Sequence, residues 1–262
     1  MRGSSLVLAL AAASGAALPA LARSGDAPRA VSVAVAANLK PAFEEIAAEW
    51  KAKNHGVEVR ATYGSSGNFF SQIANGAPFD LFLAADAEFP ARVVEKGLAE
   101  GKAFTYAYGK LVVWVPKGSP LDFDRRGLAA VTDPTVKRIA IASPQLAPYG
   151  RAAQAALQAA GVYDAVKDRI VLGQTVSQAA QFVESGNAQI GFLPQSLASV
   201  PPLSDEGRSW LVPPSIYPRI EQAGVVLKGA KSATLARALA AFITGAAGRA
   251  ALEKHGYALP PG

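Results

Sequence analysis

Short apolar runs alternate along the chain with segments whose apolar residues recur at helical spacing. Residues 31–36 form the first such run. The helix predicted after it carries its apolar face on Leu39, Phe43, Ile46 and Trp50. The same order of strand and helix recurs to the end of the chain. This alternation predicts an α/β fold built from mostly parallel sheets with flanking helices.

Apolar and polar residues alternate in the second predicted strand, 57–63. The remaining predicted strands are short apolar runs: 79–84, 111–115, 139–142, 170–172, 189–193 and 224–227. The segment 201–218 is rich in proline, serine and charge, so we expect a loop there. A chain of this length and pattern contains more strands than one small sheet needs.

We therefore expect two lobes with a ligand-binding cleft between them, at the carboxyl ends of the strands. Lobe 1 is predicted to comprise residues 31–110 and 225–262, and lobe 2 residues 111–224. The crossings between the lobes are expected near Gly109 and Gly224.

Residues 1–22 differ in pattern from the rest of the chain. A positive region at Arg2 precedes an apolar run, which ends at the small-x-small cleavage site Ala20-Leu21-Ala22. The run is interrupted, unlike the roughly 20 unbroken apolar residues of a membrane anchor. These features are typical of a secretory signal peptide and predict export to the periplasm.

The composition narrows the chemistry that the chain can use. The 262 residues include no cysteine and two histidines, and the formal net charge is +6. The absence of cysteine excludes disulfides and thiolate ligands, and two histidines argue against a histidine-based metal site. Lysines and arginines are scattered without a basic stripe, which argues against nucleic acid as a partner.

Four predicted helices follow strands and begin with neutral residues: Ala37-Asn38, Ser65-Ser66-Gly67, Pro148-Tyr149-Gly150 and Thr175-Val176-Ser177. A helix start has unpaired N–H groups and a partial positive charge, so it favours an anion. Taken alone, the second of these stretches is more often an ordinary N-cap in a glycine-rich turn. If all four converge on one cleft, however, they surround a small oxyanion with neutral donors.

Charged residues near these helix starts are few. A carboxylate ligand more often calls for a bidentate arginine, and the nearby cations are Arg151 and Lys40, each in an early helix turn that can face water. Asn38 is expected at the N-cap of its helix, and Asp86 at the N-cap of the helix after the strand 79–84.

Further motifs fall in order along the chain: Ala36-Ala37-Asn38-Leu39, Gly64-Ser65-Ser66-Gly67, Gln72 to Pro78, Leu83-Ala84-Ala85-Asp86, Tyr106 to Leu111, Pro144 to Gly150, and His255-Gly256-Tyr257. Together they resemble the molybdate-binding periplasmic protein family over essentially the whole chain after the predicted signal peptide. The resemblance implies a two-lobed type II binding protein, monomeric and without a cofactor, that hands molybdate or tungstate to an ABC importer in the membrane.

The resemblance also implies a site in which the protein binds the oxyanion and not the molybdenum itself. The implied donors are the backbone at Ala37 and Asn38, the hydroxyl and N–H of Ser66, and the N–H groups of Tyr149 and Val176. Many family members have Ser or Thr where this chain has Ala37. The amide of Asn38 is expected to replace that missing hydroxyl.

Two alternatives remain open from the residues alone. The first keeps the fold and changes the ligand to sulfate, phosphate or a small carboxylate. A fully deprotonated dianion only accepts hydrogen bonds, whereas protonated phosphate also needs an acceptor, and sulfate differs from molybdate mainly in size. The second is a serine hydrolase using the 64–67 stretch, against which stands the absence of G-x-S-x-G.

Overall fold

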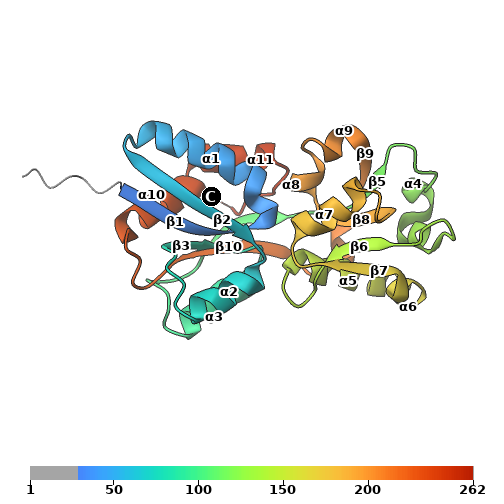
Figure 1. Cartoon of the computed structure of the whole chain (residues 1–262), viewed down its shortest axis with the longest axis horizontal. Helices are drawn as coiled ribbons and strands as arrows, with labels where there is room; N and C mark the ends of the chain where they lie inside the picture. Colours follow the sequence, from blue (N-terminus) through green and yellow to red (C-terminus); the bar gives the residue numbers. More distant parts are fainter. Residues whose placement is uncertain (1–28, 262) are drawn as a thin grey trace, which may run out of the picture.

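Two five-stranded sheets lie end to end along the long axis of the molecule, each between layers of helices (Figure 1). The computed structural model describes residues 29–261. The predicted signal peptide, residues 1–22, lies outside the described residues. An α/β fold of two lobes, as predicted from the sequence, is therefore confirmed.

The first sheet has the order β2 (Val57–Gly64), β1 (Arg29–Ala36), β3 (Leu81–Leu83), β10 (Ile220–Val226) and β4 (Phe104–Gly109). One face is covered by α1 (Lys40–Lys53), α10 (Ala233–Thr244) and α11 (Ala246–Lys254), whose apolar side chains form one buried cluster with the sheet. The other face is covered by α2 (Ser66–Ala74) and α3 (Glu88–Glu95), which form a second cluster.

The second sheet has the order β7 (Ile170–Gly173), β6 (Ile139–Ala142), β8 (Ile190–Pro194), β5 (Leu111–Pro116) and β9 (Gly207–Leu211). Its α-helices are α4 (Phe123–Arg126), α5 (Pro148–Ala159), α6 (Tyr163–Val166), α7 (Val176–Glu184), α8 (Gln195–Ala198) and α9 (Leu203–Glu206). Short 3₁₀ turns are η1 (Ala37–Leu39), η2 (Gly127–Thr132), η3 (Lys167–Arg169) and η4 (Pro214–Ile216).

Both sheets are mixed, where the sequence predicted mostly parallel ones. β1 pairs in parallel with β2 and β3, and β6 pairs in parallel with β7 and β8. The strands beyond, β10 with β4 and β5 with β9, are antiparallel. The parallel strands are those joined by helices, as the alternating pattern requires, and the antiparallel ones are the strands at the crossings between the lobes.

Three strands lie outside the predicted ranges, and the first is β4, for which no strand was predicted. The segment 201–218 contains α9 and the edge strand β9, although we expected only a loop. β9 is mostly exposed, so its sequence shows no apolar run, and Trp210 on it packs on Phe123 with ring centroids 5.9 Å apart. β10 begins at Ile220, four residues before the predicted start, because the polar pair Glu221-Gln222 hides this part of the strand from the apolar pattern.

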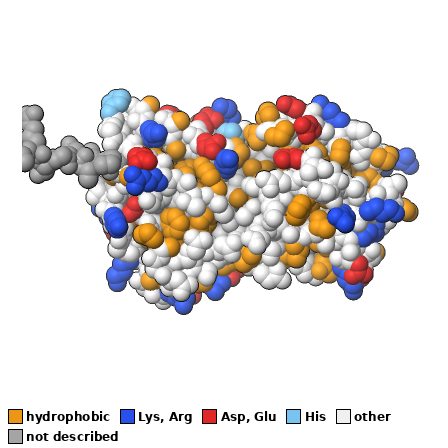
Figure 2. Space-filling model, viewed as in Figure 1, with side chains coloured by type: hydrophobic (Ala, Val, Ile, Leu, Met, Phe, Trp, Pro, Cys, Tyr) orange, Lys and Arg blue, Asp and Glu red, His pale blue; other side chains and the backbone are white. Residues whose placement is uncertain are grey.

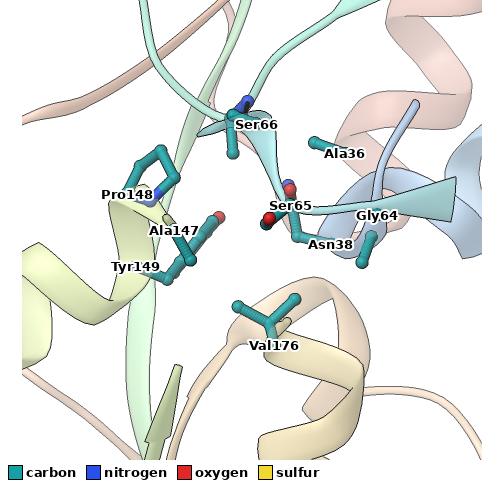
Figure 3. Close-up of a pocket in the computed structure, with 11 residues that line it drawn as sticks. Ala36, Asn38, Gly64, Ser65, Ser66, Ala147, Pro148, Tyr149 and Val176 are labelled. Carbon is teal, nitrogen blue, oxygen red and sulfur yellow. Dashed lines mark hydrogen bonds between the residues drawn. The ribbon is translucent and has the colours of Figure 1, made fainter. Parts of the chain in front are cut away.

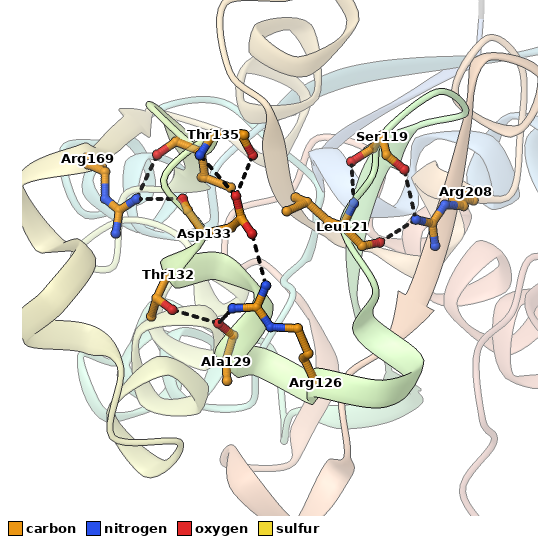
Figure 4. Close-up of polar contacts among 10 residues, drawn as sticks. Ser119, Leu121, Arg126, Ala129, Thr132, Asp133, Thr135, Arg169 and Arg208 are labelled. Carbon is orange, nitrogen blue, oxygen red and sulfur yellow. Dashed lines mark hydrogen bonds and ion pairs between the residues drawn. The ribbon is translucent and has the colours of Figure 1, made fainter.

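Arginines fix the loops at the far end of the second lobe (Figure 4). Arg126 pairs with Asp133 at 3.0 Å, and Arg169 donates to the Val136 carbonyl at 2.7 Å. Arg208 donates to the carbonyls of Ser119 and Leu121. These side chains have structural partners away from the junction between the lobes.

Within residues 29–261, no single helix is long and apolar enough to cross a membrane. α10 and α11 reach such a length only as a pair bent by 58°. Both helices contribute fully buried residues, among them Leu239 and Leu252, to the core of the first lobe.

Candidate functional site

A small cavity lies between the two lobes (Figure 3). The first lobe lines it with Ala36, Ala37, Asn38, Gly64, Ser65, Ser66 and Ala85, and the second lobe with Ala147, Pro148, Tyr149 and Val176. All five residues that the family resemblance implied as ligands are therefore brought together around one space. Their role as ligands remains a prediction.

Helix starts at the carboxyl ends of parallel strands build most of this cavity. β1 ends at Ala36 and continues directly into η1, and β2 ends at Gly64 just before α2. In the second lobe, short loops lead from β6 to α5 and from β7 to α7. Carboxyl ends of parallel strands meet at one edge of a sheet, which is why segments far apart in sequence converge here.

The first N–H groups of these helices point to a site for an acceptor. In the part of the chain that the structure describes, no acceptor is bound to the N–H of Asn38, Ser66, Tyr149 or Val176. Such groups have no partner within their own helix. The four therefore offer a set of free donors from both lobes, with the positive ends of the helix dipoles behind them.

Ser65 and Ser66 have different hydrogen-bonding partners. Ser65 is the N-cap of α2, and its hydroxyl accepts from the Asn68 N–H at 3.4 Å. The Ser66 hydroxyl instead accepts from the Ala85 N–H at 2.9 Å. Because a hydroxyl has one hydrogen, this acceptor contact leaves the Ser66 O–H available to donate to a ligand in the cavity.

Asn38 is not the N-cap of its helix, contrary to the prediction. A 3₁₀ turn precedes α1, and the residue before that turn is Ala36. The Asn38 side chain is buried, and its amide donates to Gln222 Oε1 and to the Tyr257 hydroxyl, both at 2.9 Å. Both amide hydrogens are thus used inside the protein, so this amide does not replace the hydroxyl missing at Ala37.

The nearby cations are directed elsewhere. Arg151 pairs with Asp86 across the lobes and lies 3.5 Å from Glu88, and Lys40 lies 3.9 Å from Glu44. Among residues 29–261, no charged side chain lines the cavity. Any anion there is held by neutral donors alone.

Asp86 lies just outside the cavity at the start of α3. The N-cap of α3 is Ala87 and not Asp86 as predicted, but the Asp86 Oδ1 accepts from the Phe89 N–H at 3.1 Å and so still bonds to the helix start. Burial raises the pKa of the Asp86 carboxyl more than the Phe89 N–H and the Arg151 guanidinium lower it. The carboxyl is thus held by contacts to both lobes in a largely dehydrated position.

Comparison with known proteins identifies the family. A model of the bacterial extracellular solute-binding proteins matches residues 31–258. The chain belongs to this family. The family resemblance found in the sequence motifs is also confirmed, because several similar proteins carry molybdate-binding names.

Three of these solute-binding relatives are similar over nearly their whole length. The molybdate-binding protein ModA of Rhodobacter capsulatus is 40% identical over 250 residues, which is 95% of this chain and 94% of that protein. The periplasmic molybdate-binding protein of Azotobacter vinelandii matches with a TM-score of 0.82 and 33% identity, covering 88% of this chain and 100% of that one. A substrate-binding domain assigned to a molybdenum ABC transporter of Clostridium difficile matches with a TM-score of 0.67 and 26% identity, covering 88% and 99%.

Sequence reasoning missed the buried polar side chains around the cavity of this solute-binding protein. Asn38 bonds to Gln222 through its amide and to Ser196 through its carbonyl. The Tyr106 hydroxyl bonds to Gln222, and the Tyr257 hydroxyl bonds to Ser196. The sequence signal that could have indicated this network was Gln222, a polar residue in a mostly apolar strand. Tyr257 belonged to a motif of the family resemblance, but its sequence position gave no indication that it contacts Asn38.

Proposed function

We propose that this solute-binding protein captures molybdate, and tungstate as its close chemical analogue, in the cavity between its lobes. One observation carries the proposal: free N–H groups of Asn38, Ser66, Tyr149 and Val176 surround a cavity with no charged side chain in its described wall. A tetrahedral dianion accepts hydrogen bonds and donates none, so a wall of donors complements it fully. The four helix dipoles supply the attraction that a cation supplies elsewhere.

The size and the neutral lining of the cavity argue against the other ligands considered. The cavity is small compared with the roughly 300–1,000 Å³ of pockets for organic molecules of drug size. A small carboxylate is disfavoured because Arg151, the cation that could hold it, is bound to Asp86. Phosphate, protonated at neutral pH, would leave its hydrogen without a carboxylate acceptor. Sulfate is separated from molybdate only by the length of the hydrogen bonds that the cavity allows.

We further propose that the chain is not an enzyme. The Ser66 hydroxyl bonds to a backbone N–H and not to a base, and neither histidine lines the cavity. His255 instead contacts Glu45 at 2.9 Å. A serine nucleophile without a base lacks the group that activates it.

The names of the relatives support a role in import. One solved relative is assigned to a molybdenum ABC transporter, so we propose a membrane permease of that class as the partner. We also propose an N-terminal signal peptide, a periplasmic location and a monomeric state. Figure 2 shows positive and negative side chains interspersed over both lobes, which favours a small ligand over nucleic acid.

The test is calorimetric titration of the protein, lacking residues 1–22, with molybdate, tungstate, sulfate and phosphate in turn. We expect one-to-one binding of molybdate and tungstate, and binding of sulfate and phosphate at least tenfold weaker. Equal affinity for sulfate and molybdate would overturn the proposed selectivity. Absence of heat with all four anions would overturn the function and leave the family assignment intact.

A further inference from the structure

Gln222 is a fully buried amide on the strand by which the chain returns to the first lobe. Its exposed fraction is 0%, and β10 places it between β3 and β4. The pairing of β10 with β4 shifts between Gln222 and Ala223, which leaves Tyr106 as an extra residue on β4. Irregularities of this kind redirect side chains, and they are common beside functional sites.

The Gln222 carboxamide joins two of the four helix starts. Its Oε1 accepts from the Asn38 amide at 2.9 Å and from the Tyr106 hydroxyl at 3.1 Å. Its Nε2 donates to the Tyr149 hydroxyl at 3.1 Å. Asn38 and Tyr149 line the cavity from opposite lobes, whereas Gln222 does not line it.

The chain leaves room for this contact at one glycine. Gly109 ends β4, where the chain first crosses between the lobes. A Cβ atom at this position would overlap the Tyr149 hydroxyl and would lie 2.7 Å from Gln222 Nε2. The absence of a side chain at Gly109 therefore allows the second lobe to bring Tyr149 against Gln222.

We propose that Gln222 is a positioning residue for anion binding, which holds the helix starts at Asn38 and Tyr149 in place when the lobes close. The proposal rests on the proposed function, since it concerns the same cavity. The Gln222–Tyr149 bond crosses the lobes, so it is made in the closed form and lost when they separate. It thereby favours the form in which donors of both lobes surround the anion.

An uncharged amide suits this position. It is both donor and acceptor, so it can satisfy Asn38 and Tyr149 together. An apolar side chain would leave those buried groups without partners. Burial raises the pKa values of Tyr106 and Tyr149, so the hydroxyls stay neutral and place no negative charge beneath a bound anion.

The first experiment compares Gln222→Met, Tyr149→Phe and the double variant by calorimetric titration with molybdate. Tyr149→Phe keeps the ring and the backbone N–H, so it tests the hydroxyl alone. Each single variant should bind about tenfold more weakly, and Gln222→Met should have a smaller effect in the Tyr149→Phe background. The control is Glu221→Gln, the neighbouring residue, whose contact to the Thr105 hydroxyl stays within the first lobe. It should bind like the wild type.

These titrations can overturn the proposal in three ways. Wild-type affinity in Tyr149→Phe would do so, even if Gln222→Met fails to fold. An equal effect of Gln222→Met in both backgrounds would show that Gln222 does not act through Tyr149. An equal loss in Glu221→Gln would show a general effect of altering β10.

A second experiment measures lobe closure without relying on molybdate. The chain has no cysteine, so Lys96→Cys on the first lobe and Lys137→Cys on the second, both exposed, accept a pair of spin labels. Without any anion, the Gln222→Met protein should show a larger share of long interlobe distances than the wild type. Unchanged distances would overturn the proposal. If wild type binds no molybdate but this difference appears, only the proposed function fails.

Discussion

At the scale of single residues, the hydrogen-bonding groups that the cavity offers to a ligand depend on which side-chain atoms are already hydrogen-bonded within the protein. The Ser66 hydroxyl accepts a hydrogen bond from the Ala85 N–H, so its own hydrogen is available for the proposed ligand. The Asn38 amide is engaged by Gln222 and Tyr257, so only its backbone N–H remains for the ligand. Two polar side chains beside the same cavity therefore make different contributions.

Replacing Ser66 with alanine removes one donor to the anion and leaves the four N–H groups in place. Because a hydrogen bond to a charged group contributes about 1.5–3 kcal/mol, molybdate affinity should fall about 10- to 100-fold in calorimetric titration. Ser71→Ala, at an exposed position of the same helix, is the control and should bind normally. Wild-type affinity in Ser66→Ala would contradict the assignment of this hydroxyl.

The sequence identified the residues of the cavity better than the directions of their side chains. The strand–helix pattern marked four segments, and the family resemblance implied five residues within them, all of which line the cavity: Ala37, Asn38, Ser66, Tyr149 and Val176. The direction of the Asn38 amide depends on partners 184 and 219 residues away. No local pattern encodes contacts at that separation.

At the scale of helices and strands, local pattern predicted the parallel part of each sheet and missed its antiparallel edge. The strands β1 and β6 are apolar runs followed by amphipathic helices, so their sequences show their structure. β9 is mostly exposed, and β10 contains Glu221 and Gln222, so both depend on pairing with distant strands. These strands, which the local sequence pattern does not predict, lie next to the crossings between the lobes.

The start of α5 depends on the absence of a side chain at Gly150. A Cβ atom there would overlap the backbone carbonyl of Ala142 at the end of β6. Gly150→Ala should therefore displace the Tyr149 N–H, weaken molybdate binding at least tenfold, and destabilise the protein by about 1–3 kcal/mol in thermal unfolding. Gly118→Ala is the control, since nothing lies within 4 Å of a Cβ at Gly118. Equal behaviour of the two variants would contradict this packing argument.

α1 and α11 are joined by Glu45, which contacts Lys254 and His255, each at 2.9 Å. Hydrogen bonds from Lys254 and then His255 lower the pKa of Glu45. A lowered pKa means that the ionised carboxylate stabilises the folded state above the ordinary glutamate pKa, and that this contribution is lost as the pH falls through the lowered value.

Glu45→Gln should therefore reduce stability by less than about 1 kcal/mol at neutral pH, because the pair is partly exposed. The difference from wild type should shrink as the pH falls below about 4. Chemical unfolding at a series of pH values measures this, with Glu253→Gln at an exposed position of α11 as control. A difference that grows on acidification would contradict the assigned sign.

At the scale of the whole molecule, contacts between the lobes surround the cavity. The Gly67 N–H donates to the Leu146 carbonyl at 3.0 Å, and the Ser196 hydroxyl donates to the Asn38 carbonyl at 2.8 Å. The Arg151–Asp86 pair joins the lobes beside the cavity. These contacts would favour a closed form without an anion, and a bound anion would add hydrogen bonds that it accepts from donors of both lobes.

Arg151→Gln should weaken this closure without changing which anion binds. Affinities for molybdate and sulfate should fall by the same factor, because both need the closed form and neither touches Arg151. Removing both charges with Asp86→Asn and Arg151→Gln should recover most of the affinity, since it leaves no unpaired buried carboxylate. Parallel titrations measure both variants. A loss confined to small carboxylates would instead favour a carboxylate ligand held by Arg151.

The most direct measurement is a crystal structure of the molybdate complex with diffraction data collected at the molybdenum absorption edge. The account predicts one anomalous peak in the cavity, with ligand oxygens about 2.7–3.2 Å from the backbone nitrogens of Asn38, Ser66, Tyr149 and Val176. It also predicts no charged side chain in contact with the anion. A peak beside Arg151, or outside the junction between the lobes, would contradict it.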